Sequence, residues 1–227
     1  MIPYFGYSTM ERAVLPGEVV TAKINVSMLS SIPNTGDGNV FLMLDLHTAG
    51  IIHYFEGPCI RMELYAESAL IEGIKRLQLQ RGTFMFASAD LGRPLWVQTF
   101  ARYFDTGIAF IRKSRQYETV KIVDVIGDVE NKHVIIYDDM TRSASTLINA
   151  AEAYMSRGAL SCYAVLSHLA LNNDTVVDKL LHSPIIKILA TNSHQMSQCS
   201  AVKSNPDRFL ILDISSTFEM AIRGFYR

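Results

Sequence analysis

The sequence predicts an α/β protein with parallel sheets flanked by helices. Short apolar segments of strand length alternate along the chain with longer segments that have helical periodicity. Acidic residues follow several of the apolar segments, at the strand ends where ligands bind in folds of this class. The chain has 227 residues, 49% of them hydrophobic, which is enough for one large domain or two small lobes.

The composition disfavours several classes of protein. A net charge of −1 argues against binding to nucleic acid or to a membrane surface. No apolar run approaches the roughly 18 residues that span a bilayer, and no basic segment precedes a long apolar run, so we expect no signal peptide. The widely spaced Cys59, Cys162 and Cys199 are typical of reduced thiols, so we expect a cytoplasmic protein.

Residues 1–62 predict a small unit. Residues 1–7 have the composition of an apolar strand, which needs neighbours from a partner chain or from a preceding segment. Thr21 is expected to cap a helix that runs to about residue 31. Three apolar residues of this helix are expected to face inward: Ile24, Met28 and Leu29.

Asp45 and His47 stand at the end of a second expected strand, residues 40–46. Residues two apart in a strand share one side of it. An acid and a histidine so placed suit a Mg²⁺–phosphate site or a proton transfer. The same spacing also occurs as a purely structural feature, and the residues alone leave both interpretations open.

The remainder of the chain predicts a complete α/β lobe over residues 63–214. Helices are expected at about 64–80, 94–104 and 174–182. Further strands are expected at 83–88, 107–111, 122–128, 160–166, 185–190 and 209–214. Residues 112–121 are polar and of mixed charge, which predicts a long mobile loop. A closing helix, 215–227, is expected to join the first unit.

Residues 133–158 are the clearest candidate for a binding site. An apolar strand is followed by Asp138 and Asp139, then by a loop of small residues and a helix that ends at Gly158. Backbone N–H groups at a helix N-terminus favour a phosphate. Carboxylates accept hydrogen bonds from sugar hydroxyls or bind Mg²⁺. An ordinary strand–loop–helix unit with solvated acids has the same pattern.

Several segments together resemble one family. Residues 133–158 resemble the phosphoribosyl pyrophosphate loop of type I phosphoribosyltransferases and of phosphoribosyl pyrophosphate synthetases. Residues 2–23 (IPYFGYSTMERAVLPGEVVTAK) and 43–56 (MLDLHTAGIIHYFE) resemble the synthetases, in which comparable segments read PY-x-Y-ARQDR…TAK and MDLH-x-x-QIQGFF. The likeness continues through residues 64–67, 125–129, 190–193 and 212–215.

The resemblance implies two phosphoribosyltransferase-like lobes with parallel sheets flanked by helices, the first lobe being incomplete. It also implies an enzyme of nucleotide biosynthesis, a ribose-phosphate pyrophosphokinase that transfers pyrophosphate from ATP to the anomeric hydroxyl of ribose 5-phosphate with Mg²⁺. The implied partners are therefore ATP, ribose 5-phosphate, and either further copies of the chain or a full-length synthetase, with no nucleic acid and no membrane.

The resemblance also implies roles for individual residues. Asp45, His47 and Asp90 match metal-site residues of the family. Lys113 and Arg115 match two bases that fold over the triphosphate, and with His47 they are the expected catalytic residues. The expected ribose 5-phosphate site comprises Asp138, Asp139, Thr141, Ser143, Ala144, Ser145 and Thr146. Alone, Lys113 and Arg115 also fit a solvated surface loop.

Several positions depart from the family pattern. Thr9 and Met10 stand where an Arg and a Gln contact ATP, and Arg142 stands where an acid is expected. Arg93 replaces a glycine and Trp96 replaces an arginine. Arg142 in particular offers no acceptor to a sugar hydroxyl.

These departures leave three functions open. The first is an active ribose-phosphate pyrophosphokinase. The second is a catalytically weakened synthetase-like subunit that regulates an active partner. The third is a base phosphoribosyltransferase, which the segment around Asp45 and His47 disfavours.

Ser145 also replaces a glycine of the family pattern, at a cost on the order of 1 kcal/mol if the position needs a positive φ.

Overall fold

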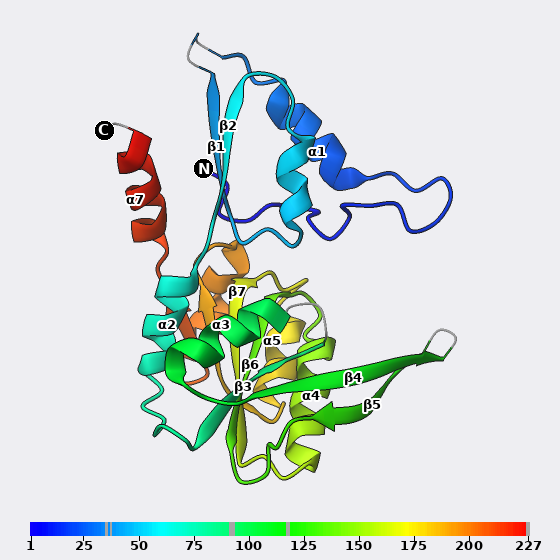
Figure 1. The fold of residues 1–227 in the computed structure, drawn as a ribbon, viewed down its shortest axis with the longest axis vertical. Coiled ribbons are helices and arrows are strands. Elements are labelled where there is room, and N and C mark those ends of the chain that lie inside the picture. Colours follow the sequence, from blue (N-terminus) through cyan, green and yellow to red (C-terminus); the bar gives the residue numbers. More distant parts are fainter. Residues whose placement is uncertain (35, 37, 91–93, 117–118, 226–227) are drawn as a thin grey trace. The chain divides into compact units, whose positions relative to one another are not determined.

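The computed structural model describes residues 1–34, 36, 38–90, 94–116 and 119–225. The chain divides into two compact units, residues 1–66 with 214–227 and residues 67–213 (Figure 1). The division expected from the sequence was 1–62 with 215–227, and 63–214. None of the described helices has the length and apolar character needed to cross a bilayer.

The first unit is built on two parallel strands, β1 (Asn39–Leu44) and β2 (Cys59–Leu64). The short helix η1 (Ala49–Tyr54) lies in the connection between them, and the unit also contains α1 (Thr21–Ser30) and α7 (Ser215–Phe225). Its core comprises Phe5, Ala22, Val26, Phe41, Met43, Leu46, Ile51 and Phe55.

The expected strand over residues 1–7 is wrong. Only Ile2 pairs, through a single bridge to Met43. Pro3 has no N–H group for a ladder, and Tyr7 takes a φ of 61°. The strand β2 was not predicted; a helix was expected to begin near its last residue.

The inward face predicted for α1 is also wrong in part. Ala22 and Val26 are buried, whereas Ile24 and Met28 are 50% and 59% exposed. Val20, and not Thr21, occupies the N-cap position, with no side-chain hydrogen bond. Residues four apart share a helical face, so Ala22 and Val26 form the packed face of α1 and Ile24 and Met28 lie together on an exposed one.

The second unit is a seven-stranded sheet in the order β5-β4-β3-β6-β7-β8-β9. Its strands are β3 (Phe84–Ser88), β4 (Ile108–Gln116), β5 (Thr119–Ile126), β6 (His133–Thr141), β7 (Ser161–Leu169), β8 (Ile185–Thr191) and β9 (Phe209–Leu212). All neighbours pair in parallel except β4 and β5. The predicted α/β class with parallel strands is confirmed.

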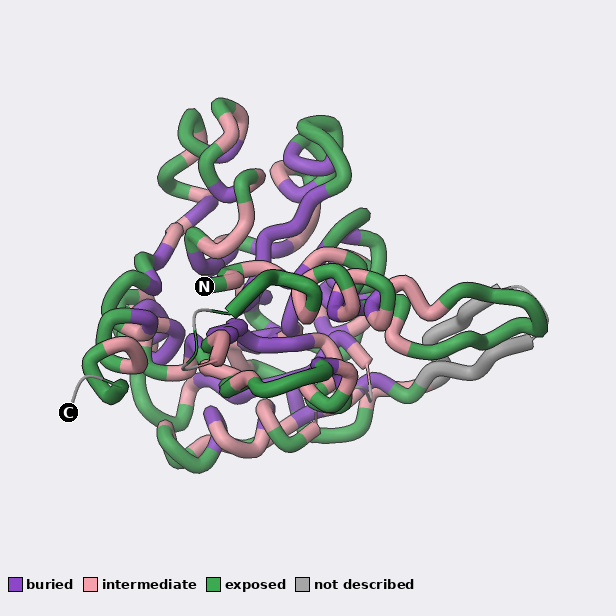
Figure 2. Tube along the Cα trace, turned by 90° about the horizontal axis from the view of Figure 1, so that it is seen from above, coloured by how far each residue is buried: buried purple, intermediate pink, exposed green. Residues whose placement is uncertain are grey.

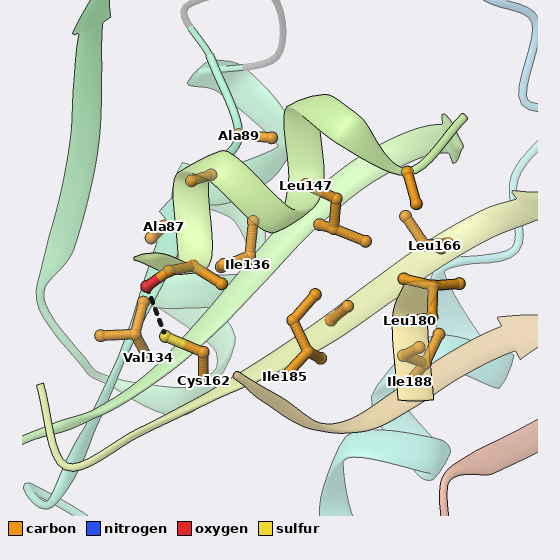
Figure 3. Close-up of a cluster of buried hydrophobic side chains, with 14 of the residues drawn as sticks. Ala87, Ala89, Val134, Ile136, Leu147, Cys162, Leu166, Leu180, Ile185 and Ile188 are labelled. Carbon is orange, nitrogen blue, oxygen red and sulfur yellow. Dashed lines mark hydrogen bonds between the residues drawn. The ribbon is translucent and has the colours of Figure 1, made fainter. Parts of the chain in front are cut away.

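Helices cover both faces of this sheet, and its central strands β3, β6, β7 and β8 are buried along most of their length. Figure 2 shows the whole trace coloured by burial. The helices are α2 (Glu67–Lys75), α3 (Pro94–Phe104), α4 (Ser145–Ser156), α5 (Thr175–Leu181), η2 (Gln195–Gln198) and α6 (Ser200–Lys203). On one face, Ala87 and Ile136 pack with Leu147 of α4 and Leu180 of α5 (Figure 3). On the other face, Phe86 stacks on Phe100 of α3, with ring centroids 5.7 Å apart.

Of the predicted loop over residues 112–121, the described residues 112–116 and 119–121 instead lie in the antiparallel strands β4 and β5, which we call the β4–β5 hairpin (Figure 1). Its polar sequence gave no strand signal, since the far part of a two-stranded ribbon needs no apolar face to cover a core. At its base, Asp124 accepts a 2.6 Å hydrogen bond from Arg157 and lies 3.9 Å from Arg112. Arg157 directly follows α4, so this ion pair ties the hairpin to that helix.

Candidate functional site

The predicted acids of the second unit gather at one edge of its sheet. The strands β3, β6, β7 and β8 run in parallel, so their carboxyl ends lie along the same edge, which we call the carboxyl edge. Asp90 follows β3 by two residues, and Asp138 and Asp139 lie near the end of β6. Ser88 pairs in register with Tyr137, so Asp90, two residues after Ser88, and the pair Asp138–Asp139, directly after Tyr137, follow the same part of the edge.

The acid pair lies within β6 itself, whereas the sequence predicted that it follows directly after the apolar strand. The strand β6 continues to Thr141, and Asp138 and Met140 pair with Leu166 and His168 of β7. Asp139 is only 3% exposed, and its backbone N–H donates a 3.0 Å hydrogen bond to Asp138 Oδ1. Strand pairing therefore fixes the backbone of both acids at the carboxyl edge.

Burial raises the pKa of Asp138 well above its usual range. The charge of Asp139, a hydrogen bond with Asp139 and the charge of Asp90 raise the pKa further, against a smaller opposing effect of the Asp139 backbone N–H. Three carboxylates crowded at a strand end repel one another. A cation or hydroxyl donors bound here would relieve that repulsion.

We expect Asp138→Asn to raise the melting temperature at neutral pH in the absence of added Mg²⁺. The raised pKa of folded Asp138 contributes stability that is present below the unfolded pKa, about 3.9, and is lost as pH rises through the folded pKa. Asparagine does not titrate. The stabilisation should therefore be small near pH 4.5 and should grow toward pH 8 in thermal melts. Equal shifts at both pH values would contradict this account.

The residues predicted to bind the 5-phosphate connect β6 to α4. Thr141 is buried at the strand end, Ser145 and Thr146 begin α4, and Ser143 Oγ accepts a 3.4 Å hydrogen bond from Ser145 N–H. Ala144 is the N-cap and has a φ of 61°. The positive φ considered for Ser145 thus lies on Ala144. The first turn of α4 directs its backbone N–H groups toward the carboxyl edge.

Asp45 and His47 belong to the first unit, and the geometry expected for them is wrong. The strand β1 ends at Leu44, and Asp45 takes a φ of 40°, so the two side chains do not share a side of a strand. Asp45 is 5% exposed, and its Oδ2 accepts a 3.0 Å hydrogen bond from Ala66 N–H. This contact gives Asp45 a structural role in its own unit.

Lys113 and Arg115 lie in β4, where their backbones pair with Ile122 and Val120. Their side chains lie outside the described residues, as does the departure at Arg93. Among the described residues, no three His, Cys, Asp or Glu side chains form a cluster of the kind that holds a metal ion. A Mg²⁺ ion typically binds through one or two carboxylates with substrate phosphates and water, and the acids of the carboxyl edge fit that chemistry.

A buried polar network at the ends of β7 and β8 was not predicted. Thr191 Oγ1 donates a 2.6 Å hydrogen bond to the backbone oxygen of Ser167, and His168 Nδ1 lies 2.7 Å from Ser193 Oγ. Ser167, His168 and Thr191 are almost completely buried. The sequence feature that could have indicated this network is the polar residues at the ends of the apolar segments 160–166 and 185–190. The network connects the carboxyl ends of neighbouring strands beside β6.

Comparisons with known proteins agree on one family. Residues 110–227 match the family described as phosphoribosyl synthetase-associated domain. A ribose-phosphate pyrophosphokinase from Fusobacterium nucleatum is 30% identical over 223 residues, 98% of this chain and 67% of that protein. One from Chlorobaculum tepidum is 28% identical over 229 residues, 100% of this chain and 66% of that protein. One from Gloeobacter violaceus is 32% identical over 195 residues, 85% of this chain and 56% of that protein.

The chain thus spans between 56% and 67% of the length of these relatives. A crystal structure of phosphoribosylpyrophosphate synthetase from Mycobacterium smegmatis matches with a TM-score of 0.80 and 21% identity. The match covers 99% of this chain and 70% of that one. At this identity the match establishes the fold.

Proposed function

The chain belongs to the ribose-phosphate pyrophosphokinase family, and we propose that it transfers a pyrophosphoryl group from ATP to the anomeric hydroxyl of ribose 5-phosphate. In this reaction the anomeric oxygen bonds to the β-phosphorus of ATP, the bond from that phosphorus to the α-phosphate oxygen breaks, and AMP leaves. The hydroxyl loses its proton. The products are phosphoribosyl pyrophosphate and AMP.

The observation that carries this proposal is the placement of Asp90, Asp138 and Asp139 at the carboxyl edge, beside the N-terminus of α4. The first turn of α4 and the loop 141–146 bind the 5-phosphate through backbone N–H groups and hydroxyls. Asp138 and Asp139 accept hydrogen bonds from the ribose hydroxyls. Binding both ends of the sugar phosphate orients its anomeric hydroxyl for attack.

The transferring group is a polyanion, so its charge must be offset. Bound Mg²⁺ supplies positive charge there, and we assign Asp90 to its binding. Lys113 and Arg115 contribute two further cations from the hairpin, and Asp45 and His47 are the proposed residues of the first unit for metal and ATP. Asp45 accepts a hydrogen bond from Ala66 N–H, and a carboxylate has further acceptor positions for a metal ion.

We also propose that the protein acts as an oligomer, with further copies of itself or with a full-length synthetase. Val40, Ile60 and Met62 of the two-stranded sheet are 43%, 48% and 37% exposed. Apolar surface on so small a sheet favours association. A cytoplasmic location stays a prediction; it is supported by Cys59, Cys162 and Cys199, which are free thiols.

Calorimetric titration with ribose 5-phosphate and Mg²⁺ tests the assignment of the site. The chain should bind the sugar phosphate, and Asp138→Ala should abolish that binding because the ribose hydroxyls lose an acceptor. Asp207→Ala, which removes an exposed acid of the same unit, is the matched control and should bind normally. Binding that survives Asp138→Ala unchanged would refute the assignment.

A further inference from the structure

The residues of the carboxyl edge that face α3, which we call the α3 wall, have no assigned role in the proposed reaction. Alternation along β3 directs Ala87 to the α4 side and Phe86 and Ser88 to the α3 side. Tyr137 pairs in register with Ser88, and its ring contacts α3 through Phe100, at 5.0 Å between centroids. Ser88 and Tyr137 therefore lie side by side beneath the start of α3.

The hydroxyl of Ser88 is the first observation that points to a ligand. Ser88 is 1% exposed, and its Oγ has no hydrogen-bond partner among the described residues. Tyr154 donates a 2.8 Å hydrogen bond to the backbone oxygen of Ser88 and leaves the hydroxyl unsatisfied. A buried hydroxyl without a partner destabilises the fold, whereas alanine at the same place would not. Ser88 lies two residues before Asp90, at the end of β3.

Trp96 is the second, independent observation. It is the third residue of α3 and is half-buried. Its indole ring lies 6.1 Å from the ring of Tyr137 and 6.3 Å from that of Phe100, between centroids. Tyr137 immediately precedes Asp138 on β6. The partly buried indole thus stands against Tyr137 on the α3 side of the carboxyl edge, at a position where the family pattern has an arginine.

The chemistry of this wall differs from that of the rest of the edge. An indole offers a flat apolar face and one N–H donor, and it has no charge to offer a phosphate. A serine hydroxyl both donates and accepts. Together they complement an uncharged ring that has an apolar face and polar groups on its rim.

We propose that Trp96 and Ser88 form a subsite for the uncharged ring of a bound substrate, with the ring packed on the indole and a rim group hydrogen-bonded to the Ser88 hydroxyl. The inference rests on the proposed function, because it assigns the subsite to that reaction's ligands. Two parts of those ligands have the required chemistry, the furanose of ribose 5-phosphate and the purine of the adenine nucleotide.

Fluorescence tests the subsite directly, since Trp96 is the only tryptophan in the chain. The chain is titrated with ribose 5-phosphate and Mg²⁺, and separately with AMP, while calorimetry follows binding in parallel. A change in emission that saturates with the calorimetric binding of one ligand identifies which ring occupies the subsite. Calorimetric saturation by both ligands with unchanged emission would overturn the inference and leave the proposed function standing.

Two variants complete the test. Trp96→Ala should lower the affinity for the ligand so identified by about 10-fold. Trp96→Phe should restore most of that affinity because an aromatic face remains. Ser88→Ala should raise the melting temperature and at the same time lower the affinity for that ligand. Unchanged affinity in Trp96→Ala, or a stabilised Ser88→Ala that binds normally, would overturn the role of that residue. Failure of the unaltered chain to bind either ligand would instead contradict the proposed function.

Discussion

Replacing Gly127 by alanine is expected to lower the free energy of unfolding by about 3 to 5 kcal/mol. Gly127 follows β5 and has a φ of 111°, a region that other residues rarely adopt. A Cβ atom there would lie 2.7 Å from the backbone oxygen of Ile108 and 2.9 Å from Ala109 Cα. Both are backbone atoms of β4, so relief of the clash requires movement of that strand.

Gly82→Ala is the matched control, because it separates backbone strain from the steric clash. Gly82 also has a positive φ, 82°, but no atom lies within 4 Å of the position that its Cβ would take. Its replacement should therefore cost only about 1 kcal/mol. Urea unfolding of both variants measures the difference. Similar losses for the two would show that the contact between Gly127 and β4 is not what requires glycine.

Lys113→Ala is expected to lower kcat about 100- to 1000-fold while the affinity for ribose 5-phosphate stays unchanged. Lys113 belongs to the β4–β5 hairpin, whereas the residues assigned to the sugar phosphate lie at the carboxyl edge. A cation that acts only on the transferring group changes the transition state and leaves binding of the sugar phosphate intact.

Lys121→Ala provides the matched control on the same hairpin. Lys121 lies on β5, where its backbone pairs with Ser114, and the account assigns it no role. Steady-state kinetics should show near-normal turnover for this variant. If Lys121→Ala lost as much activity as Lys113→Ala, the effect would belong to the general charge of the hairpin. If Lys113→Ala instead lost affinity for ribose 5-phosphate, its assignment to the transferring group would be wrong.

The sequence predicted best the elements whose apolar pattern and end signals coincide. The helix α3 begins at Pro94 and ends at Phe104 as expected, because proline is tolerated in a first turn and the segment has a strongly apolar face. The strand β3 ends at Ser88 as expected. Its five residues are buried on both faces, so they form a continuous apolar run that is easily recognised.

Other elements depend on pairing that no local pattern reveals. The strand β2 is polar enough to escape notice, and it forms through its register with β1. The hairpin of β4 and β5 likewise shows little apolar alternation in its far part. The strand β6 runs on through Asp138 and Asp139 because β7 continues to pair with it. Strand pairing outweighs local composition in each case.

The candidate site was predictable in part. Asp90, Asp138 and Asp139 come together because parallel strands place their carboxyl ends on one edge. The interpretation of Asp45 and His47 assumed strand geometry, and the backbone turns at Asp45 instead. No sequence pattern marks Ser88, since an unsatisfied hydroxyl is a property of packing and register.

The most direct test of the central claim is the conversion of ATP to AMP by the purified chain, followed by ³¹P NMR with ribose 5-phosphate and Mg²⁺ present. We predict AMP and phosphoribosyl pyrophosphate in equal amounts. Neither product should form when ribose 5-phosphate is omitted, or when the Asp138→Ala variant is used in place of the unaltered chain. A folded chain that binds ribose 5-phosphate but produces no AMP would contradict the claim that this chain is itself the enzyme.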